Sequence, residues 1–290
     1  MPPQVSDVRY TNGMRYAFRI LNVFTVAGDR LSGNPLCVFE DARGLTDAQM
    51  QALTRQFNLS ESTFIFPSDQ ATAHVRIFTP AFEMPFAGHP TLGTAHVVRA
   101  LRGGDQITLA MKAGIVPVMA HRDTWTLRAA KAPVTRPVDA TRAELAQMVS
   151  LPDDAVCDEP LWVNTGSEQL VIPIASGELV RAARPVIDLI TKHGYTDARQ
   201  EAMAYLWAPD GTVRFFFTQH GAVIEDPATG SACANLGGWF IARGRTPVTM
   251  TLRQGDAVAR PSQLGLRVDA ERNIFVTGSV VELGSGSIEL

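Results

Sequence analysis

Hydrophobic and polar residues alternate along many short segments of this chain, and each such segment predicts a strand that buries one face. The alternating segments cover residues 14–24, 73–78, 106–111, 124–129, 212–217 and 273–280. Two other segments have the capping-box spacing, with Thr46 before Gln49 and Thr141 before Glu144. They predict helices that lie outside the sheets and turn their polar faces to water.

Two further helical patterns are apolar nearly all round, which predicts helices surrounded by protein rather than packed on a surface. They fall at about residues 90–102 and 230–244. Each would be the central helix of one half of the chain, with strands wrapped round it. The pattern therefore predicts two buried central helices, each enclosed by the strands of its own half.

The two halves also resemble each other in sequence. The segment that starts at Arg76 aligns with the segment that starts at Arg214, an offset of 214 − 76 = 138, and Thr91 then falls on Thr229. An offset near half the length predicts a duplicated fold. Gly, Thr and Ala are common residues, so a chance match is the alternative.

The repeat predicts one domain over residues 1–130 and a second over 131–290. The junction is expected in the polar, proline-bearing stretch of residues 131–140. The C-terminal strand could return and join the sheet of the first domain.

Composition narrows the class of protein. The chain has 290 residues, of which 46% are hydrophobic and 19% charged, as is typical of globular proteins. A net charge of -3 without a run of Lys or Arg argues against nucleic-acid or membrane partners and favours a small molecule. The N-terminus lacks a signal-peptide pattern and no apolar run is long enough for a membrane span, which predicts a cytoplasmic protein.

The three cysteines, Cys37, Cys157 and Cys233, are far apart and lack a C-x-x-C spacing. All three are expected to be reduced, buried thiols.

Both central helices follow loops of small residues. The first backbone N–H groups of a helix point outward at the positive end of its dipole, so two such starts suit a carboxylate or a developing oxyanion held from both sides. The alternative is that the glycines only permit tight turns and Thr or Ser only caps a helix. The candidate substrate-binding residues are Gly88, Pro90 and Thr91 in the first loop and Thr229, Gly230 and Ser231 in the second.

Three residues could move a proton, two of them in these loops. His89 and Asp226 occupy matching places at the two helix starts in the alignment above, although Asp226 fits an ordinary N-terminal cap equally well. Glu61 lies just before an apolar strand, and turning inward would raise its pKa by burial, whereas a solvated strand-end glutamate is the alternative. The remaining histidines lack a ligand spacing, so no metal site is expected.

Five segments, taken together, resemble the PhzF-like family of phenazine biosynthesis, which is related to diaminopimelate epimerase. They are NVFTVAGDRLSGNPLCVF, NLSESTFIF, FAGHPTLGTAHVV, VNTGSEQLVIPI and EDPATGSACANLGGWF. The resemblance spans nearly the whole chain. It implies an α+β fold of two similar domains, each a β-barrel-like sheet wrapped round a central buried helix. It also implies an active site in the cleft between the domains, and a homodimer.

The resemblance also implies the chemistry of that cleft. Glu61 would be the acid/base that moves a proton, His89 and Asp226 further active-site groups, and Gly88 and Ser231 cleft-lining residues. The best-known family reaction isomerises trans-2,3-dihydro-3-hydroxyanthranilate without metal, flavin or pyridoxal, so a small acidic substrate and no cofactor are expected. The pocket walls are expected in part from residues 22–35 and 163–170.

Two alternatives remain open at the level of sequence. One is an amino-acid epimerase or racemase, although the paired cysteines of diaminopimelate epimerase are replaced here by Ala87, Gly88 and Asp226 at the helix starts. The other is a small-ligand-binding protein that keeps the cleft without the chemistry.

Overall fold

The computed structural model describes residues 13–129, 131–197, 200–219 and 221–290. It contains two sheets, and the strands of the first are β1 (Arg15–Val23), β2 (Asn34–Phe39), β3 (Glu61–Phe66), β4 (Ala73–Phe78), β5 (Glu83–Met84), β6 (Gln106–Met111), β7 (Gly114–His121), β8 (Thr124–Arg128), β16 (Val248–Gln254), β17 (Ser262–Val268) and β18 (Ile274–Glu289). The strands of the second are β9 (Val134–Arg136), β10 (Leu161–Asn164), β11 (Glu168–Pro173), β12 (Tyr195–Thr196), β13 (Glu201–Trp207), β14 (Val213–Gln219) and β15 (Ala222–Asp226). The helices are α1 (Asp47–Phe57), α2 (Gly88–Arg102), α3 (Arg142–Met148), α4 (Gly177–Ala182), α5 (Ile187–His193) and α6 (Gly230–Ala242), with a short 3₁₀ turn at Asp256–Val258.

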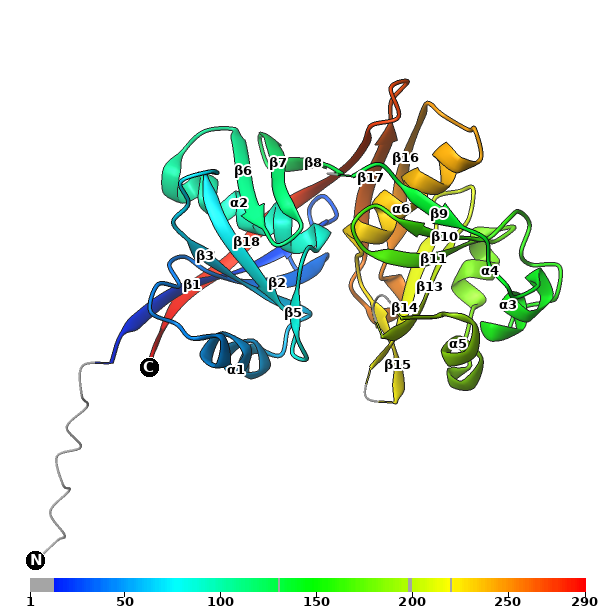
Figure 1. The fold of residues 1–290 in the computed structure, drawn as a ribbon, viewed down its shortest axis with the longest axis horizontal. Coiled ribbons are helices and arrows are strands. Elements are labelled where there is room, and N and C mark those ends of the chain that lie inside the picture. The colour runs from blue at the N-terminus through cyan, green and yellow to red at the C-terminus, as the bar shows by residue number, and fades with distance from the viewer. Residues whose placement is uncertain (1–12, 130, 198–199, 220) are drawn as a thin grey trace, which may run out of the picture.

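A closed barrel of eight strands forms the lobe on the left of Figure 1. Its strands follow the order β1, β2, β3, β4, β6, β7, β8 and β18, and β18 pairs with β1 to close the ring. Helix α2 contacts all eight of these strands, so it fills the barrel as its core. This arrangement agrees with the all-round apolar pattern of the helix, because a helix inside a barrel has no face in water.

The second lobe is built differently. Helix α6 packs against β9, β10 and β11 of the second sheet on one side and against β17 and β18 on the other. In the described residues one parallel bridge, between Thr212 and Arg253, connects the two sheets. Two sheets therefore enclose α6, where the sequence predicted one barrel-like sheet in each half.

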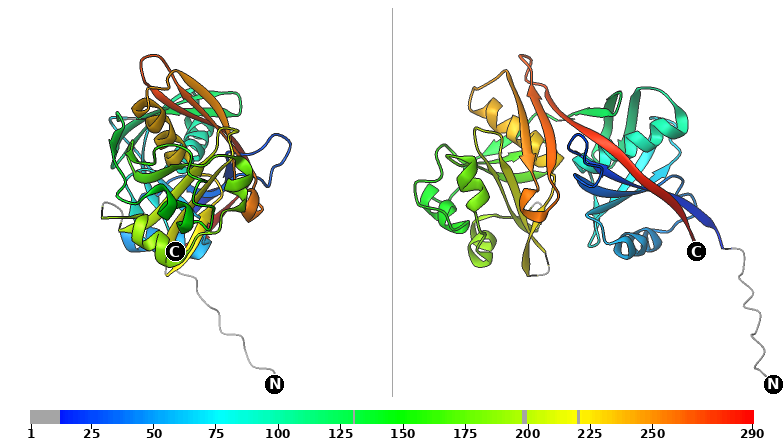
Figure 2. Two further views of the ribbon diagram at one scale, coloured as in Figure 1. Left: turned by 90° about the vertical axis from the view of Figure 1, so that its right-hand side faces the viewer. Right: turned by 180° about the vertical axis from the view of Figure 1, so that it is seen from behind.

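The longest strand joins the two lobes. The first part of β18 pairs with β17 and with β8, and its last part pairs with β1 near the N-terminus. The right-hand view of Figure 2 shows this red strand crossing from the second lobe to the first. The proposed boundary at residue 130 lies outside the described residues.

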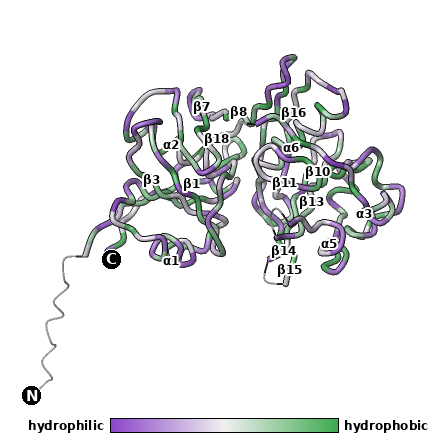
Figure 3. Tube along the Cα trace, viewed as in Figure 1, coloured by the Kyte–Doolittle hydropathy of each residue, from purple (hydrophilic) through white to green (hydrophobic). Residues whose placement is uncertain are grey.

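Several elements confirm the pattern analysis. All six segments with alternating polarity form strands, and hydrophobic and hydrophilic bands alternate along many strands in Figure 3. Thr46 and Thr141 cap α1 and α3 in the capping-box arrangement. The pattern missed α4 and α5, whose six and seven residues are too few to display a helical period. No helix within the described ranges is long and apolar enough to cross a membrane.

An ion pair that recurs in both lobes shows how the halves align. Arg76 Nη2 lies 2.7 Å from Glu83 Oε2 in the β4–β5 hairpin, and Arg214 Nη2 lies 2.6 Å from Glu225 Oε2 in the β14–β15 hairpin. The two arginines are 214 − 76 = 138 residues apart, but the two glutamates are 225 − 83 = 142 residues apart. The second hairpin is therefore four residues longer than the first.

The central helices keep the longer offset. They begin at Gly88 and Gly230, and 230 − 88 = 142. The expected match of His89 with Asp226 is wrong, because the position that corresponds to His89 is Ser231. The four extra residues fall inside the second hairpin, so the match of Thr91 with Thr229 at the shorter offset is wrong as well.

The cysteines depart from expectation at one position. Cys37 and Cys233 are buried, whereas Cys157 is exposed. Its neighbour Val156 forms a bridge with Ile174 and is buried. Successive side chains of an extended segment point to opposite sides, so Cys157 turns outward.

Candidate active site

The N-terminal ends of α2 and α6 meet between the two lobes. A Cβ built on Gly88 would lie 2.7 Å from the Cα of Gly230, and one built on Gly230 would lie 3.0 Å from the Cα of Gly88. The absence of side chains at these two positions is what allows the helices to approach so closely. Their first-turn N–H groups and positive dipole ends therefore converge on one region.

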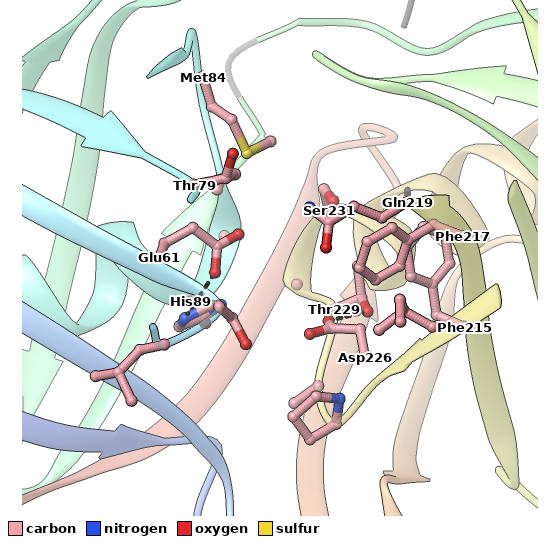
Figure 4. A pocket seen from close by; sticks show the side chains of 18 of the residues that line it. Glu61, Thr79, Met84, His89, Phe215, Phe217, Gln219, Asp226, Thr229 and Ser231 are labelled. Atoms are coloured by element: carbon pink, nitrogen blue, oxygen red, sulfur yellow. Dashed lines mark hydrogen bonds and ion pairs between the residues drawn. The ribbon is translucent and has the colours of Figure 1, made fainter. Parts of the chain in front are cut away.

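A cavity of ≈ 240 Å³ lies at this junction. Figure 4 shows Glu61 and His89 on one side of it and Asp226, Thr229 and Ser231 on the other. The predicted site residues that line it are Glu61, Gly88, His89, Asp226, Thr229, Gly230 and Ser231. The structure thus brings together seven of the nine candidates.

Pro90 and Thr91 are not among the described residues that line the cavity, and they lie behind its wall. Both are buried within the first turns of α2, and the Thr91 hydroxyl donates to the backbone carbonyl of Ala87 at 2.7 Å. Their side chains support the helix start rather than the cavity surface.

Glu61 and His89 form a close pair on the barrel side. Glu61 is the first residue of β3, its side chain is 14% exposed, and its Oε2 lies 3.3 Å from His89 Nε2. Burial lowers the pKa of His89 to about 3, opposed by its hydrogen bond to the backbone of Pro35. The imidazole is therefore neutral across the physiological pH range.

The same contacts fix the tautomer of His89. Since Nε2 faces Glu61, the nitrogen that donates to the Pro35 carbonyl is Nδ1. A neutral imidazole carries one N–H, so Nε2 presents a lone pair to Glu61. His89 consequently accepts a hydrogen bond from Glu61 whenever that carboxyl carries a proton.

Asp226 ends β15 on the opposite side of the cavity. Its Oδ1 accepts a hydrogen bond from Asn34 Nδ2 at 2.9 Å, and its Oδ2 accepts one from the Thr229 hydroxyl. Burial, together with the nearby Glu225 charge, raises the pKa of Asp226 to about 6 against the lowering effect of these two hydrogen bonds. Asp226 therefore exchanges its proton near neutral pH.

The structure excludes one of the two roles that the sequence left open for Asp226, the cap of α6. The N-terminal cap of α6 is Thr229, not Asp226. The Thr229 hydroxyl accepts from Gln254 Nε2 at 3.0 Å and so directs its own proton to the Asp226 carboxylate. Gln254 also donates to the Asp226 backbone carbonyl, which fixes the turn before the helix.

Asn34 was not among the candidates, although it lies in the stretch of residues 22–35 from which pocket walls were expected. It is fully buried on β2, and its amide donates both to Asp226 and to the backbone carbonyl of Ala228. A residue of the barrel thus orients an acid of the second lobe. The contact between Asn34 and Asp226 could not be predicted from the sequence, because 192 residues separate the two side chains.

Replacing Asn34 with Leu is expected to raise the pKa of Asp226 above about 6. The substitution removes a hydrogen bond that stabilises the charged carboxylate, which corresponds to a rise of about one pH unit. Carbon-13 NMR titration of the carboxyl signals measures this shift, with Asp226→Asn assigning the resonance and circular dichroism checking the fold. An unchanged or lowered pKa in a folded Asn34→Leu variant would contradict the role of Asn34.

The remaining walls are apolar and acidic. Figure 4 shows Phe215 and Phe217 from β14 beside Asp226, and Met84 and Thr79 on the barrel side. The carboxylate side chains along the cavity are Glu61, Glu201, Glu225 and Asp226. Among the described lining residues there is no Lys or Arg, and no group of three or more His, Cys, Asp or Glu in the described parts of the chain is arranged to hold a metal ion.

Comparisons with known proteins place this geometry in context. Residues 21–286 match the model of the phenazine biosynthesis-like (PhzC-PhzF) family. An uncharacterised isomerase of Pasteurella multocida is 37% identical over 279 residues, covering 94% of this chain and 94% of that protein. The trans-2,3-dihydro-3-hydroxyanthranilate isomerase of Pseudomonas fluorescens is 31% identical over 276 residues, covering 90% of this chain and 95% of that protein.

Solved structures have the same fold. A protein of Pseudomonas aeruginosa described as a predicted epimerase superposes with a TM-score of 0.79 at 31% identity, covering 95% of this chain and 99% of that one. A hydroxyproline epimerase of Agrobacterium vitis superposes with a TM-score of 0.61 at 15% identity, covering 95% and 93%, which shows a shared fold alone.

Proposed function

Because this chain belongs to the phenazine biosynthesis-like (PhzC-PhzF) family, we propose that it is a cofactor-independent isomerase. It moves a proton on a small carboxylate substrate by general acid/base catalysis. One observation carries the proposal: Glu61 with His89 on one lobe and Asp226 on the other face a single cavity at which two helix N-termini meet.

The proton step follows from the arrangement of these groups. The Glu61 carboxylate removes a proton from a substrate carbon, so the C–H bond breaks, an O–H bond forms and the electron pair remains on the substrate. That pair spreads into the conjugated system and its carboxylate, which the converging N–H groups of α2 and α6 stabilise. Glu61 then returns the proton to a different carbon.

His89 and Asp226 support that cycle from opposite sides. The lone pair on His89 Nε2 accepts a hydrogen bond from protonated Glu61. This hydrogen bond holds the Glu61 side chain in place while it carries the proton taken from the substrate. Asp226, with a pKa of about 6, can hold or release a second proton on the far wall near neutral pH.

The charges along the cavity favour a particular substrate. Four carboxylate side chains and no Lys or Arg line it among the described residues, so a substrate carboxylate meets N–H and O–H donors at the helix starts. A substrate amine finds carboxylate acceptors. A molecule with one carboxylate and one amine fits this distribution, as does trans-2,3-dihydro-3-hydroxyanthranilate, the substrate named for the Pseudomonas fluorescens relative.

Epimerisation by paired thiols, the main alternative, lacks its reactive groups in this cavity. Cys233 lies within α6 after the helix start, is fully buried, and has its pKa raised by burial. Gly88 and Gly230 occupy the helix starts themselves. A buried neutral thiol is a poor nucleophile and a poor base.

Proton NMR of trans-2,3-dihydro-3-hydroxyanthranilate incubated with the protein in D2O tests the proposal. We expect the substrate signals to disappear and those of a ring isomer to appear, with the deuterium content of the product showing how far the transferred proton exchanges with water. A parallel sample with trans-4-hydroxy-L-proline tests the epimerase alternative. Unchanged dihydro substrate, or inversion of the proline derivative instead, would overturn the proposed reaction.

A further inference from the structure

A chain of hydrogen bonds leads from the interior of the second lobe to the cavity wall, and its direction is fixed. From it we propose that Gln169 is a positioning residue, which compels the Ser231 hydroxyl to act as a donor toward the bound substrate. The inference rests on the proposed function, because it assigns Ser231 a partner in the same cavity. Gln169 lines the same cavity, and the role proposed here is the one that it exerts through Ser231.

The chain begins at a backbone group that can only donate. The N–H of Thr165 donates to Asn235 Oδ1 at 2.9 Å, and the Thr165 hydroxyl donates to the same oxygen at 2.7 Å. On its other side, Asn235 Nδ2 donates to the backbone carbonyl of Ser167 at 2.8 Å. A backbone N–H cannot accept and a carbonyl cannot donate, so the orientation of the Asn235 amide is determined.

That orientation determines the next two links. Asn235 Nδ2 donates to Gln169 Oε1 at 2.7 Å, so the Gln169 atom that faces Ser231 is the amide nitrogen. Gln169 Nε2 then donates to Ser231 Oγ at 3.0 Å. A hydroxyl that accepts along this line must direct its own proton elsewhere, and Ser231 lies on the cavity wall.

Burial makes the direction of this chain costly to change. The exposed fraction is 6% for Thr165, 0% for Asn235 and 1% for Gln169. Turning the Asn235 amide over would set two acceptors against each other, and turning the Gln169 amide over would set two donors against each other, in surroundings where water cannot satisfy them. The Ser231 proton is therefore oriented toward the cavity before a substrate arrives, at the second residue of α6 and beside its outward N–H groups.

Gln169→Glu tests the proposal with a side chain of nearly the same shape. At about pH 8 the carboxylate accepts from Asn235 as before, but it also accepts from Ser231, so the last link reverses and Ser231 presents lone pairs to the cavity. The probe is 3-hydroxyanthranilate, which keeps the carboxylate, amine and hydroxyl of the dihydro compound. We expect its Kd by calorimetry, and KM for the dihydro compound, to rise about 10- to 100-fold with a much smaller change in kcat.

Ser231→Ala and the double variant separate positioning from the added charge. If Gln169 acts through Ser231, Gln169→Glu weakens the probe far less in the Ser231→Ala background than in the wild type. Equal effects in both backgrounds would overturn the proposal, since the charge alone would then explain the loss. Thermal unfolding of each variant shows whether the fold is retained.

Neutron diffraction of the deuterated, ligand-free protein tests the orientation without any ligand. The expected result is a Ser231 deuteron directed into the cavity and a Gln169 amide deuteron on the line to Ser231. A Ser231 deuteron on that line would overturn the proposal. In solution the two proposals fail separately. If the wild type turns the substrate over and Gln169→Glu leaves turnover and binding unchanged, the positioning role is wrong and the proposed reaction stands. If the wild type shows no turnover but Gln169→Glu still weakens probe binding, the proposed reaction is wrong and the positioning role stands.

Discussion

Glu61→Gln is expected to lower turnover by at least about 10³-fold while the protein stays folded. Gln has nearly the same size as Glu, so the cavity keeps its shape, but an amide can neither take a proton from carbon nor return one. Proton NMR of trans-2,3-dihydro-3-hydroxyanthranilate, with wild type and variant in parallel, measures the loss. The effect is large because Glu61 carries both halves of the proposed transfer.

A second carboxylate in the same cavity provides the comparison for this result. Glu201→Gln makes the identical chemical change in the wall formed by β13, where the side chain also lines the cavity. The expected loss is below about tenfold, since removing one surrounding charge alters binding rather than the proton step. Comparable losses in both variants, or Glu61→Gln activity within a few-fold of wild type, would refute the assigned role of Glu61.

Gly88→Ala is expected to destabilise the contact between the lobes and to reduce turnover together. The added Cβ would lie 2.7 Å from Gly230 Cα and 2.8 Å from its carbonyl carbon, and both neighbours are backbone atoms that cannot rotate away. Carbon atoms in contact prefer about 3.5 to 4.0 Å, so the helix starts must separate by about 1 Å. Overpacking of this kind costs about 1–3 kcal/mol, and a displacement of about 1 Å costs about 10²-fold in rate.

Chemical denaturation and the turnover assay measure both effects of Gly88→Ala. Gly284→Ala is the matched control, because a Cβ at that position meets no atom within 4 Å. The control should behave as wild type in both measurements. A Gly88→Ala variant with wild-type stability and turnover would show that the close approach of the helix starts is unnecessary.

Much of the fold could be predicted from the sequence because its signals are local. Alternating polarity marked strands, two capping boxes marked α1 and α3, and two all-round apolar patterns marked the helices that the sheets enclose. The open architecture round α6 carried no such signal. Whether a sheet closes depends on pairings such as β1 with β18, which join residues more than 250 positions apart.

The site residues could likewise be predicted only where the signal is local. Glu61, His89 and Asp226, which the sequence offered as proton-transfer candidates, all line the cavity, and their catalytic roles stay predictions. Their relation was wrong, because four extra residues in the β14–β15 hairpin shift the repeat and place Met84, not His89, at the position that corresponds to Asp226. The homodimer and the cytoplasmic location expected from the sequence stay predictions.

The supporting amides Asn34 and Gln169 lie in the two stretches expected to form pocket walls, but neither could be singled out as an individual residue. Asn34 and Gln169 are ordinary polar residues of strands until tertiary structure places them beside Asp226 and Ser231. The hydrogen bonds from Asn34 to Asp226 and from Gln169 to Ser231 join residues 192 and 62 positions apart, and contacts at such separations produce no pattern in the sequence. Such residues emerge only by following the partners of each buried polar atom.

A crystal structure of the protein with 3-hydroxyanthranilate tests the central claim most directly. The ring is expected in the cavity beside the two helix starts, with its carboxylate on the N–H groups and a ring carbon within about 3.5 Å of a Glu61 oxygen, the separation that proton transfer requires. Binding outside this cavity, or a ring out of reach of Glu61, would contradict the assignment of the cavity as the active site.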